Sequence, residues 1–440
     1  MRPLKRYLRA AFKGILRLYF SGIEEVGERP AANTGGRVFV ANHRNALIDP
    51  ILVLTHAPCD ISPLGKSTLW KMPGLKWLLD LADAVPVQRR SDDPNKAASA
   101  NDEMFDKIAQ HLARGGNVLV FPEGTSHNEP HMIRLKTGAA RMLDRARALG
   151  ARDLTFQAVG LEFDSRHKFR SKAVVAYGPA RRLDAIDAEL PSDVAHDSIE
   201  EVTRVMHDDL ADMVIEGATW EERRLVLRVA ELIRNEAARN DVVRSSASFA
   251  DAVSVAQGVE RAREVLATSA RDHIGEVGRA VDRYFASLEK LRLGDDQVAG
   301  NAPRDGRAVS LLGWLSLPLF PIGVALYFLP YQLPRLVASR TEEVDQHSTL
   351  KLGTGLVAYP VWAGLLIGGA WAMSHTRAQA LAATAVIVAS PFAALHWLEH
   401  IAKLRRALRL SRLDDELAKL VAERGEALAA ISRARSAAGA

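Results

Sequence analysis

The chain has 440 residues, of which 48% are hydrophobic and 25% are charged, and this length allows two or three structural units. Its 58 basic and 53 acidic residues are interleaved without an aromatic-basic stripe, which argues against nucleic-acid binding, while the net charge of +5 fits an anionic membrane surface or phosphorylated substrates. The single cysteine, Cys59, excludes an internal disulfide bond and lies in no cluster of zinc-binding type.

The first segment, residues 1–30, has the pattern of a basic amphipathic helix over residues 2–20. Apolar side chains such as Leu4, Leu8 and Phe12 recur at helical spacing, and Arg and Lys cover much of the remaining surface. Two interpretations are open. The helix lies in the headgroup plane of an anionic membrane, or it packs on the protein with its cations in water. Charges interrupt any apolar run of signal-peptide type.

Strand-like and helix-like patterns alternate over residues 31–185. The predicted strands are 38–41, 61–64, 84–87, 117–121, 154–163 and 173–177, and the predicted helices between them are 46–54, 67–81, 96–114 and 135–149. This alternation predicts an α/β sandwich with a mostly parallel sheet.

A histidine and an aspartate follow the first predicted strand, in the stretch from Asn42 to Pro50. His43 titrates near neutral pH and can take a proton from a hydroxyl, and Asp49 would fix its tautomer from the other ring nitrogen. The spacing does not place both residues on one helix face, so the loop must fold back for Asp49 to reach the ring. Alone, such a pair is more often structural than catalytic.

Three further segments follow predicted strands. They are Val85-Pro86-Val87-Gln88-Arg89, Phe121-Pro122-Glu123-Gly124 and Val159-Gly160-Leu161. Ligands bind outside the carboxyl ends of parallel strands, so we expect His43, Arg89 and Glu123 to meet at one edge of the sheet.

With Asn42-His43 and Asp49, these segments resemble, in order, the four blocks of the glycerolipid acyltransferases over about residues 30–185. The context at 121–127 and 168–171 is most similar to the branch that contains the yeast glycerol-3-phosphate and dihydroxyacetone-phosphate acyltransferases. Five residues separate the histidine from the aspartate, as in that branch, whereas most of the family has four. Ala158 stands where the fourth block usually has a proline.

The resemblance implies acyl transfer from a thioester to an alcohol. His43 would be the general base and Asp49 would orient it. No Ser or Cys nucleophile motif is present, so the alcohol would attack directly. Arg89 would bind the phosphate of the acceptor, or else it is a solvated charge before a polar loop.

The third block would contact the acceptor as well. Glu123 would bind acceptor hydroxyls, or else it is a turn carboxylate bonded to nearby amides. Gly124 allows close backbone approach. Lys136 stands where the family often has a lysine near the phosphate, although a surface lysine on a helix fits equally.

The implied protein is a membrane-bound enzyme with acyl-CoA or acyl-ACP as donor and glycerol 3-phosphate as first-choice acceptor. Dihydroxyacetone phosphate and 1-acylglycerol 3-phosphate are the next acceptors. No metal or bound cofactor is implied. The alternatives are an inactive lipid-binding scaffold, which would not need all four blocks, and a hydrolase, which would not need the phosphate-binding arginine.

The second half of the chain carries no recognisable chemistry. Residues 186–300 are charged and alanine-rich and predict a helical accessory region, and 299–307 read as a linker. Residues 399–440 predict a charged C-terminal helix.

Between these lies a predicted membrane region, residues 308–398, with apolar segments at 308–331, 352–373 and 378–398. Pro318 and Pro321 should break the first segment. We expect the catalytic domain to face the cytosol. The basic cluster 403–412 predicts a cytosolic tail, so the last two segments would form a hairpin and the first would re-enter without crossing.

Overall fold

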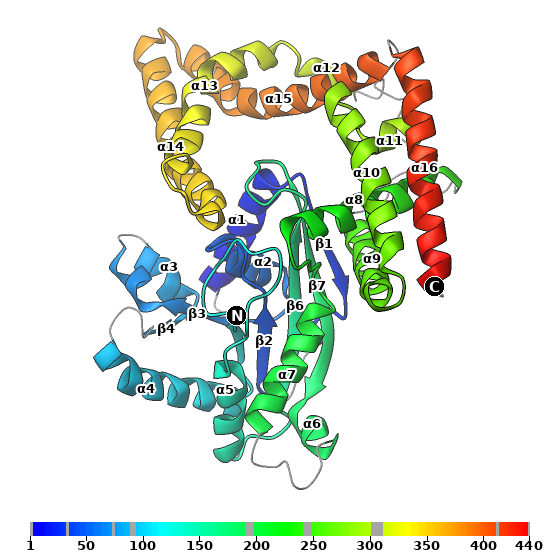
Figure 1. Cartoon of the computed structure of the whole chain (residues 1–440). Coiled ribbons are helices and arrows are strands. Elements are labelled where there is room, and N and C mark those ends of the chain that lie inside the picture. Colours follow the sequence, from blue (N-terminus) through cyan, green and yellow to red (C-terminus); the bar gives the residue numbers. More distant parts are fainter. Residues whose placement is uncertain are drawn as a thin grey trace. The chain divides into compact units, whose positions relative to one another are not determined.

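The structure is a computed structural model of the chain (Figure 1). It describes residues 3–31, 35–72, 75–88, 94–189, 198–240, 249–300, 311–410 and 413–438. Two compact units are present. The first comprises Met1–Arg223 with Ser248–Gln257, and the second comprises Arg224–Ala247 with Gly258–Ala440.

A seven-stranded sheet forms the centre of the first unit, in the order β1-β7-β6-β2-β5-β3-β4. The strands are β1 Gly22–Gly27, β2 Arg37–Ala41, β3 Ser62–Lys66, β4 Val85–Val87, β5 Asn117–Val120, β6 Thr155–Phe163 and β7 Lys172–Arg182. Neighbouring strands are parallel except β6 and β7, which are antiparallel. The predicted α/β architecture with a mostly parallel sheet is confirmed.

Helices cover this sheet. They are α1 Pro3–Tyr19, α2 Ile48–His56, η1 Ser67–Lys71, α3 Leu75–Leu81, α4 Pro94–Ala113, α5 Gly138–Ala148, α6 Leu183–Glu189 and α7 Ser198–Ala211. Every residue of β2 is buried, as expected for a central parallel strand covered on both faces. Helices α4, α5 and α7 contribute Ile108, Leu143 and Met206 to the core cluster that contains Val38 and Phe156.

The compact unit extends beyond residue 185, where we placed the boundary of the acyltransferase domain. Helix α7 places Val202, Met206 and Leu210 in the core of the sheet domain, so this part of the accessory region belongs to the first unit. The predicted helix at 67–81 is two elements, η1 and α3. The sequence Pro73-Gly74 lies between them and disfavours a continuous helix.

Helix α1 packs on α2, and the C-terminal end of α1 enters the core. Leu16 is fully buried, as is Phe20 just beyond the helix, whereas Leu4 and Tyr7 near the N-terminus are 51% and 75% exposed. One end of the amphipathic helix is therefore part of the core, and the other end leaves apolar side chains uncovered.

The second unit begins with a helical bundle. Its elements are α8 Trp220–Asn240, which starts in the first unit, α9 Phe249–Ser269, which is shared likewise, α10 Arg271–Leu291, α11 Asp295–Val298 and the C-terminal α16 Asp414–Ala438. Helix α16 packs on α10, and their buried residues form one hydrophobic cluster that includes Val281, Leu288 and Leu420.

A fully buried carboxylate joins these helices. Asp295 accepts hydrogen bonds from Tyr284 Oη at 2.6 Å, Asn235 Nδ2 at 2.7 Å and Arg424 Nε at 2.8 Å. The arginine also pairs with Glu236. Three donors, one of which is the positively charged Arg424, compensate the loss of water around Asp295. They tie helices α8, α10, α11 and α16 together.

Apolar helices complete the unit. They are α12 Leu311–Leu315, α13 Leu319–Ala338, α14 Val344–Met373 and α15 Arg377–Leu410. The expected break is present, since α12 ends before Pro318, which is the N-cap residue of α13. A Cβ atom at Gly323 would collide with the carbonyl group of Ser390, so α13 and α15 cross at close distance.

Two helices in the described part of the chain are long and apolar enough to cross a membrane, Val344–Met373 and Arg377–Ala402. They contain the second and third predicted segments. Residues 374–376 connect them, as expected for a hairpin. Apolar side chains of α14 are left uncovered, among them Val357, Val361 and Leu365.

The contacts of Asp295 predict that the stability of the second unit depends on Arg424. Arg424→Ala would leave Asp295 buried without its charge partner, which costs roughly 3–5 kcal/mol when a buried pair is broken. We expect a clear drop in the Tm of the detergent-solubilised chain.

The matched control is Arg283→Ala on the same helix pair. Arg283 and Glu426 form an ion pair at 3.1 Å whose side chains are 62% and 63% exposed, so its loss should cost about 0–1 kcal/mol. Equal Tm shifts for the two variants would contradict the assigned role of the cluster.

Candidate active site

The predicted dyad is formed. His43 Nδ1 lies 3.1 Å from Asp49 Oδ2, and both side chains are nearly or fully buried. Because a carboxylate accepts hydrogen bonds, His43 donates from Nδ1 and its Nε2 is left as the basic nitrogen of the neutral ring. The ring stacks on Phe121, with centroids 4.1 Å apart and planes at 22°, which fixes its orientation.

The loop between the two residues folds back around the aspartate, as the sequence required. The amides of Arg44 and Asn45 each donate to Asp49 Oδ2 at 2.7 Å, in addition to the imidazole. Asp49 lies in the first turn of α2, where the helix dipole also favours a negative charge. These contacts show how five intervening residues still bring the carboxylate to the ring.

Glu123 brings the third block to the dyad. Its Oε1 accepts the amide of His43 at 2.7 Å, while Oε2 accepts the amide of Ile133 at 3.3 Å and contacts His127 Nε2. The expected meeting of these blocks is explained by the sheet, since β2 and β5 are parallel neighbours. A carboxylate has about four acceptor sites, so these contacts leave the prediction that Glu123 binds acceptor hydroxyls untested.

The fourth block is joined to the first by Asn42. Its Nδ2 donates to the carbonyl of Leu161 at 3.0 Å, and its Oδ1 accepts the amide of Leu161 at 2.7 Å. This side chain thus continues the pairing of β2 with β6 beyond the end of β2. Asn42, the residue before the histidine, is held by two hydrogen bonds to Leu161.

Gly124 and Lys136 lie against each other. Gly124 has a φ of +75°, and a Cβ atom there would collide with the ammonium group of Lys136. The amide of Lys136 donates to the carbonyl of Pro122 at 2.8 Å. The backbone conformation therefore favours glycine, and the exposed side chain of Lys136 lies along the third block.

Two arginines that we did not predict lie beside the dyad. Arg166 donates from Nη1 to the carbonyl oxygens of Arg44 and His127, both at 3.3 Å, and its guanidinium lies 5.6 Å from the ring centroid of Trp220. Arg44 is only 3% exposed. The position of Arg166 beside the dyad depends on contacts between loops that are far apart in sequence. No sequence motif therefore indicated either arginine.

Both arginines carry their charge in a buried environment. Burial, followed by the charge of Arg44, lowers the pKa of Arg166 to about 10. Burial and then the charge of Arg223 lower the pKa of Arg44. Nearby carboxylates oppose these shifts, including Asp49 for Arg166 and Glu162 for both arginines. Glu162 also forms an ion pair with Arg223 Nη2 at 2.7 Å. An anion bound near Arg44 and Arg166 would favour their charged forms.

The remaining site prediction, Arg89, lies outside the described residues. Within the described part of the chain, no group of three or more His, Cys, Asp or Glu side chains has the arrangement of a metal site. His127 was missed as a partner of Glu123. The i to i+4 spacing of the two residues was visible in the sequence, but the irregular backbone that joins them was not.

The part of the chain that carries these side chains matches known proteins. Residues 21–160 match the family model described as Acyltransferase. Glycerol-3-phosphate O-acyltransferase 2 of Saccharomyces cerevisiae is 32% identical over 136 residues, which cover 30% of this chain and 18% of that protein. A putative 1-acyl-sn-glycerol-3-phosphate acyltransferase of Caenorhabditis elegans is 31% identical over 111 residues, covering 25% and 40%.

Among solved structures, the 1-acyl-sn-glycerophosphate acyltransferase of Thermotoga maritima matches with a TM-score of 0.34 and 16% identity, covering 47% of this chain and 83% of that one. The chain spans less than half the length of the curated relatives named above. The resemblance to the yeast-type branch is confirmed by the Saccharomyces match. With the family match over residues 21–160, the chain therefore carries a domain of the Acyltransferase family.

Proposed function

We propose that the chain is a membrane-bound O-acyltransferase that moves a fatty acyl group from acyl-CoA or acyl-ACP to a hydroxyl of glycerol 3-phosphate. The observation that best supports this proposal is the buried dyad. Asp49 contacts His43 through Nδ1, so Nε2 is not used in this contact. The names of the yeast relatives support the acceptor. The name of the Caenorhabditis relative supports 1-acylglycerol 3-phosphate as the alternative acceptor.

In the proposed reaction, His43 Nε2 takes the proton of the acceptor hydroxyl as its oxygen attacks the thioester carbonyl. The tetrahedral intermediate collapses by breaking the carbon–sulfur bond. The imidazolium returns the proton to the departing thiolate, so the products are an ester and a free thiol. Asp49 stabilises the imidazolium throughout, and its three hydrogen bonds prevent it from turning away.

The acceptor phosphate would be held by cations at the same edge of the sheet. Arg89 is the predicted ligand, and Lys136 lies along the third block beside Gly124. The positive charges of Arg44 and Arg166, whose pKa values are lowered chiefly by burial, would be stabilised by a dianion bound nearby. A hydrolase acting on water would have no use for this positive charge.

Membrane attachment is supported by the two apolar helices and the uncovered side chains of α14. The bundle adds a second argument. Helix α10 precedes the apolar region and α16 follows it, yet the two pack together. Both ends of the apolar region then lie on one side of the membrane, which requires an even number of crossings. This favours α14 and α15 as the crossings and a re-entrant α12 and α13.

The general base is tested first. His43→Ala should lower kcat by about 10²–10⁴-fold, the usual contribution of a positioned base. Asp49→Asn should lower kcat with little change in the KM of the acceptor. Labelled acyl thioester, membranes containing the protein and each candidate acceptor in turn provide the assay. Full turnover by His43→Ala at saturating acceptor would refute the catalytic assignment.

The phosphate ligand is tested by KM values. Losing a hydrogen bond between charged groups costs roughly 1.5–3 kcal/mol, so Arg89→Ala should raise the acceptor KM by about 10- to 150-fold. The donor KM should change little. A rise confined to the donor would move Arg89 to the thioester side of the site.

Topology is tested by cysteine labelling in a Cys59→Ala background. We expect the catalytic domain and the turn after α13 to face the cytosol. Ser339→Cys lies in this turn and is exposed, whereas Ser348 is fully buried and unsuitable. Thr376→Cys, in the exposed connection between α14 and α15, should instead react with an impermeant reagent from outside intact cells.

Labelling of Ser339→Cys from outside, with protection of Thr376→Cys, would contradict the re-entrant arrangement. Permeabilised cells serve as the control, because both cysteines should then react.

A further inference from the structure

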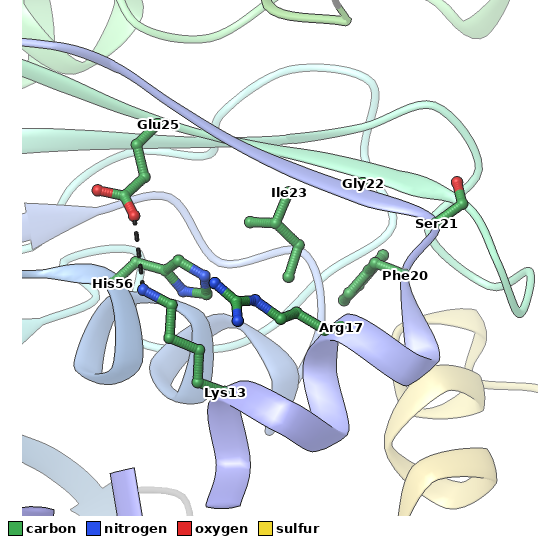
Figure 2. A pocket seen from close by; sticks show the side chains of 8 residues that line it. All are labelled: Lys13, Arg17, Phe20, Ser21, Gly22, Ile23, Glu25 and His56. Carbon is green, nitrogen blue, oxygen red and sulfur yellow. Dashed lines mark ion pairs between the residues drawn. The ribbon is translucent and has the colours of Figure 1, made fainter. Parts of the chain in front are cut away.

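A polar cavity lies between the amphipathic helix and the edge of the sheet, and Figure 2 shows its lining residues. Its volume is about 310 Å³, and it is bounded by α1, the edge strand β1 and the end of α2. Its lining residues are Lys13, Arg17, Phe20, Ser21, Gly22, Ile23, Glu25 and His56. This is the size of a site for a small ligand or headgroup. Asp49 and His56 lie at opposite ends of α2, so the cavity is separate from the dyad.

The cavity gathers positive charge that its own carboxylate does not neutralise. Lys13 and Arg17 are one helical turn apart, a like-charge spacing that destabilises a helix. Glu25 lies 3.9 Å from Lys13 but 2.7 Å from Arg29, so it is mainly engaged outside the cavity. Among the described residues, no carboxylate forms an ion pair with Arg17.

Helix capping does not account for these cations. Arg170 Nη1 already donates to three carbonyl oxygens at the end of α1, those of Arg17, Leu18 and Phe20, at 3.1–3.2 Å. At the end of α2, Arg9 Nε donates to the carbonyl of Thr55 at 3.2 Å. The side chain of Arg17 is therefore not required by either helix end.

His56 gives the cavity a proton-linked group. Its Nδ1 donates to the carbonyl of Leu52 at 3.0 Å, which leaves Nε2 without that proton in the neutral ring. Burial, opposed by this bond, and the charges of Lys13 and Arg17 lower its pKa, while Glu25 acts the other way. An anion in the cavity would raise the pKa of His56, because its negative charge would stabilise the protonated ring.

The outer surface of α1 indicates the source of the anion. Leu4, Tyr7 and Leu18 are 51%, 75% and 44% exposed and follow one side of the helix at spacings of three and eleven residues. Uncovered apolar side chains beside cations are typical of a helix that lies at a lipid surface.

We propose that this cavity binds the phosphate group of an anionic phospholipid headgroup, with Lys13 and Arg17 as its cationic ligands and His56 as a proton-linked donor. The site does not depend on the proposed acyl transfer. It would hold the first unit against an anionic membrane through a specific contact in addition to the general charge of α1.

The experiment measures lipid binding to the full chain in detergent by native mass spectrometry, with phosphatidylglycerol and phosphatidylcholine in mixed micelles. Phosphatidylglycerol carries the phosphate without being a direct product of the proposed reaction. The chain should prefer it, and Arg17→Gln should weaken its binding by about tenfold, the effect of one charge-assisted contact. Lys13→Gln should weaken binding as well.

Arg6→Gln is the matched control, since it removes one positive charge from the same helix outside the cavity. It should weaken binding less than about twofold, the effect of screened surface charge. Equal losses for Arg6→Gln and Arg17→Gln would overturn the cavity as the site. An unchanged Tm of Arg17→Gln checks that the variant folds.

Two further measurements distinguish a lipid headgroup from free phosphate and test whether binding takes up a proton. Calorimetry with inorganic phosphate should show Arg17-dependent binding that phosphatidylglycerol displaces, and tight phosphate binding that the lipid leaves intact would overturn the lipid assignment. Affinity for the lipid should rise as the pH falls from 8 to 6, because binding takes up a proton at His56. His56→Gln should abolish this rise, and a wild-type affinity independent of pH would overturn the role of His56.

Discussion

The active edge of the sheet depends on one buried carboxylate. Asp49 gathers the imidazole and two backbone amides onto a single oxygen, so a loop of otherwise free conformation closes into one shape. Without these donors the carboxylate would be buried unpaired, and without the carboxylate two buried amides would lack acceptors. The loop and the dyad therefore form together. A mutation of Asp49 that lowers activity would therefore also change the conformation of the loop from Asn42 to Asp49.

The same principle joins the other blocks. Glu123 accepts the amide of His43 across two parallel strands, and Asn42 pairs with Leu161 in the third. Asn42, after β2, and Glu123, after β5, each form side-chain hydrogen bonds with the backbone of a neighbouring segment. Residues that are distant in sequence are therefore held at one edge of the sheet by short polar contacts. The order of the strands determines which side chains meet there.

The sequence was informative where local patterns decide structure. Six strands and the meeting of the first and third blocks were predicted from apolar runs and from the rule for parallel sheets. Strand β1 was missed because its sequence, with Glu24 and Glu25 at its centre, lacks an apolar pattern, and its partner β7 lies about 150 residues later. Arg166 was missed for a related reason, since its contacts are to backbone carbonyls of two remote loops.

The packing of α16 on α10 has a consequence for biosynthesis. Asp295 is made before the apolar helices, but its partner Arg424 is made after them. During translation the growing bundle would therefore hold an incomplete charge cluster and an open apolar face until the last helix leaves the ribosome. The bundle would therefore be completed only after the intervening helices have been synthesised. It would also require that the segments before and after these helices lie in the same compartment. A chain inserted with an odd number of membrane crossings could not bring α16 to α10, so its bundle would stay incomplete and would be exposed to quality control.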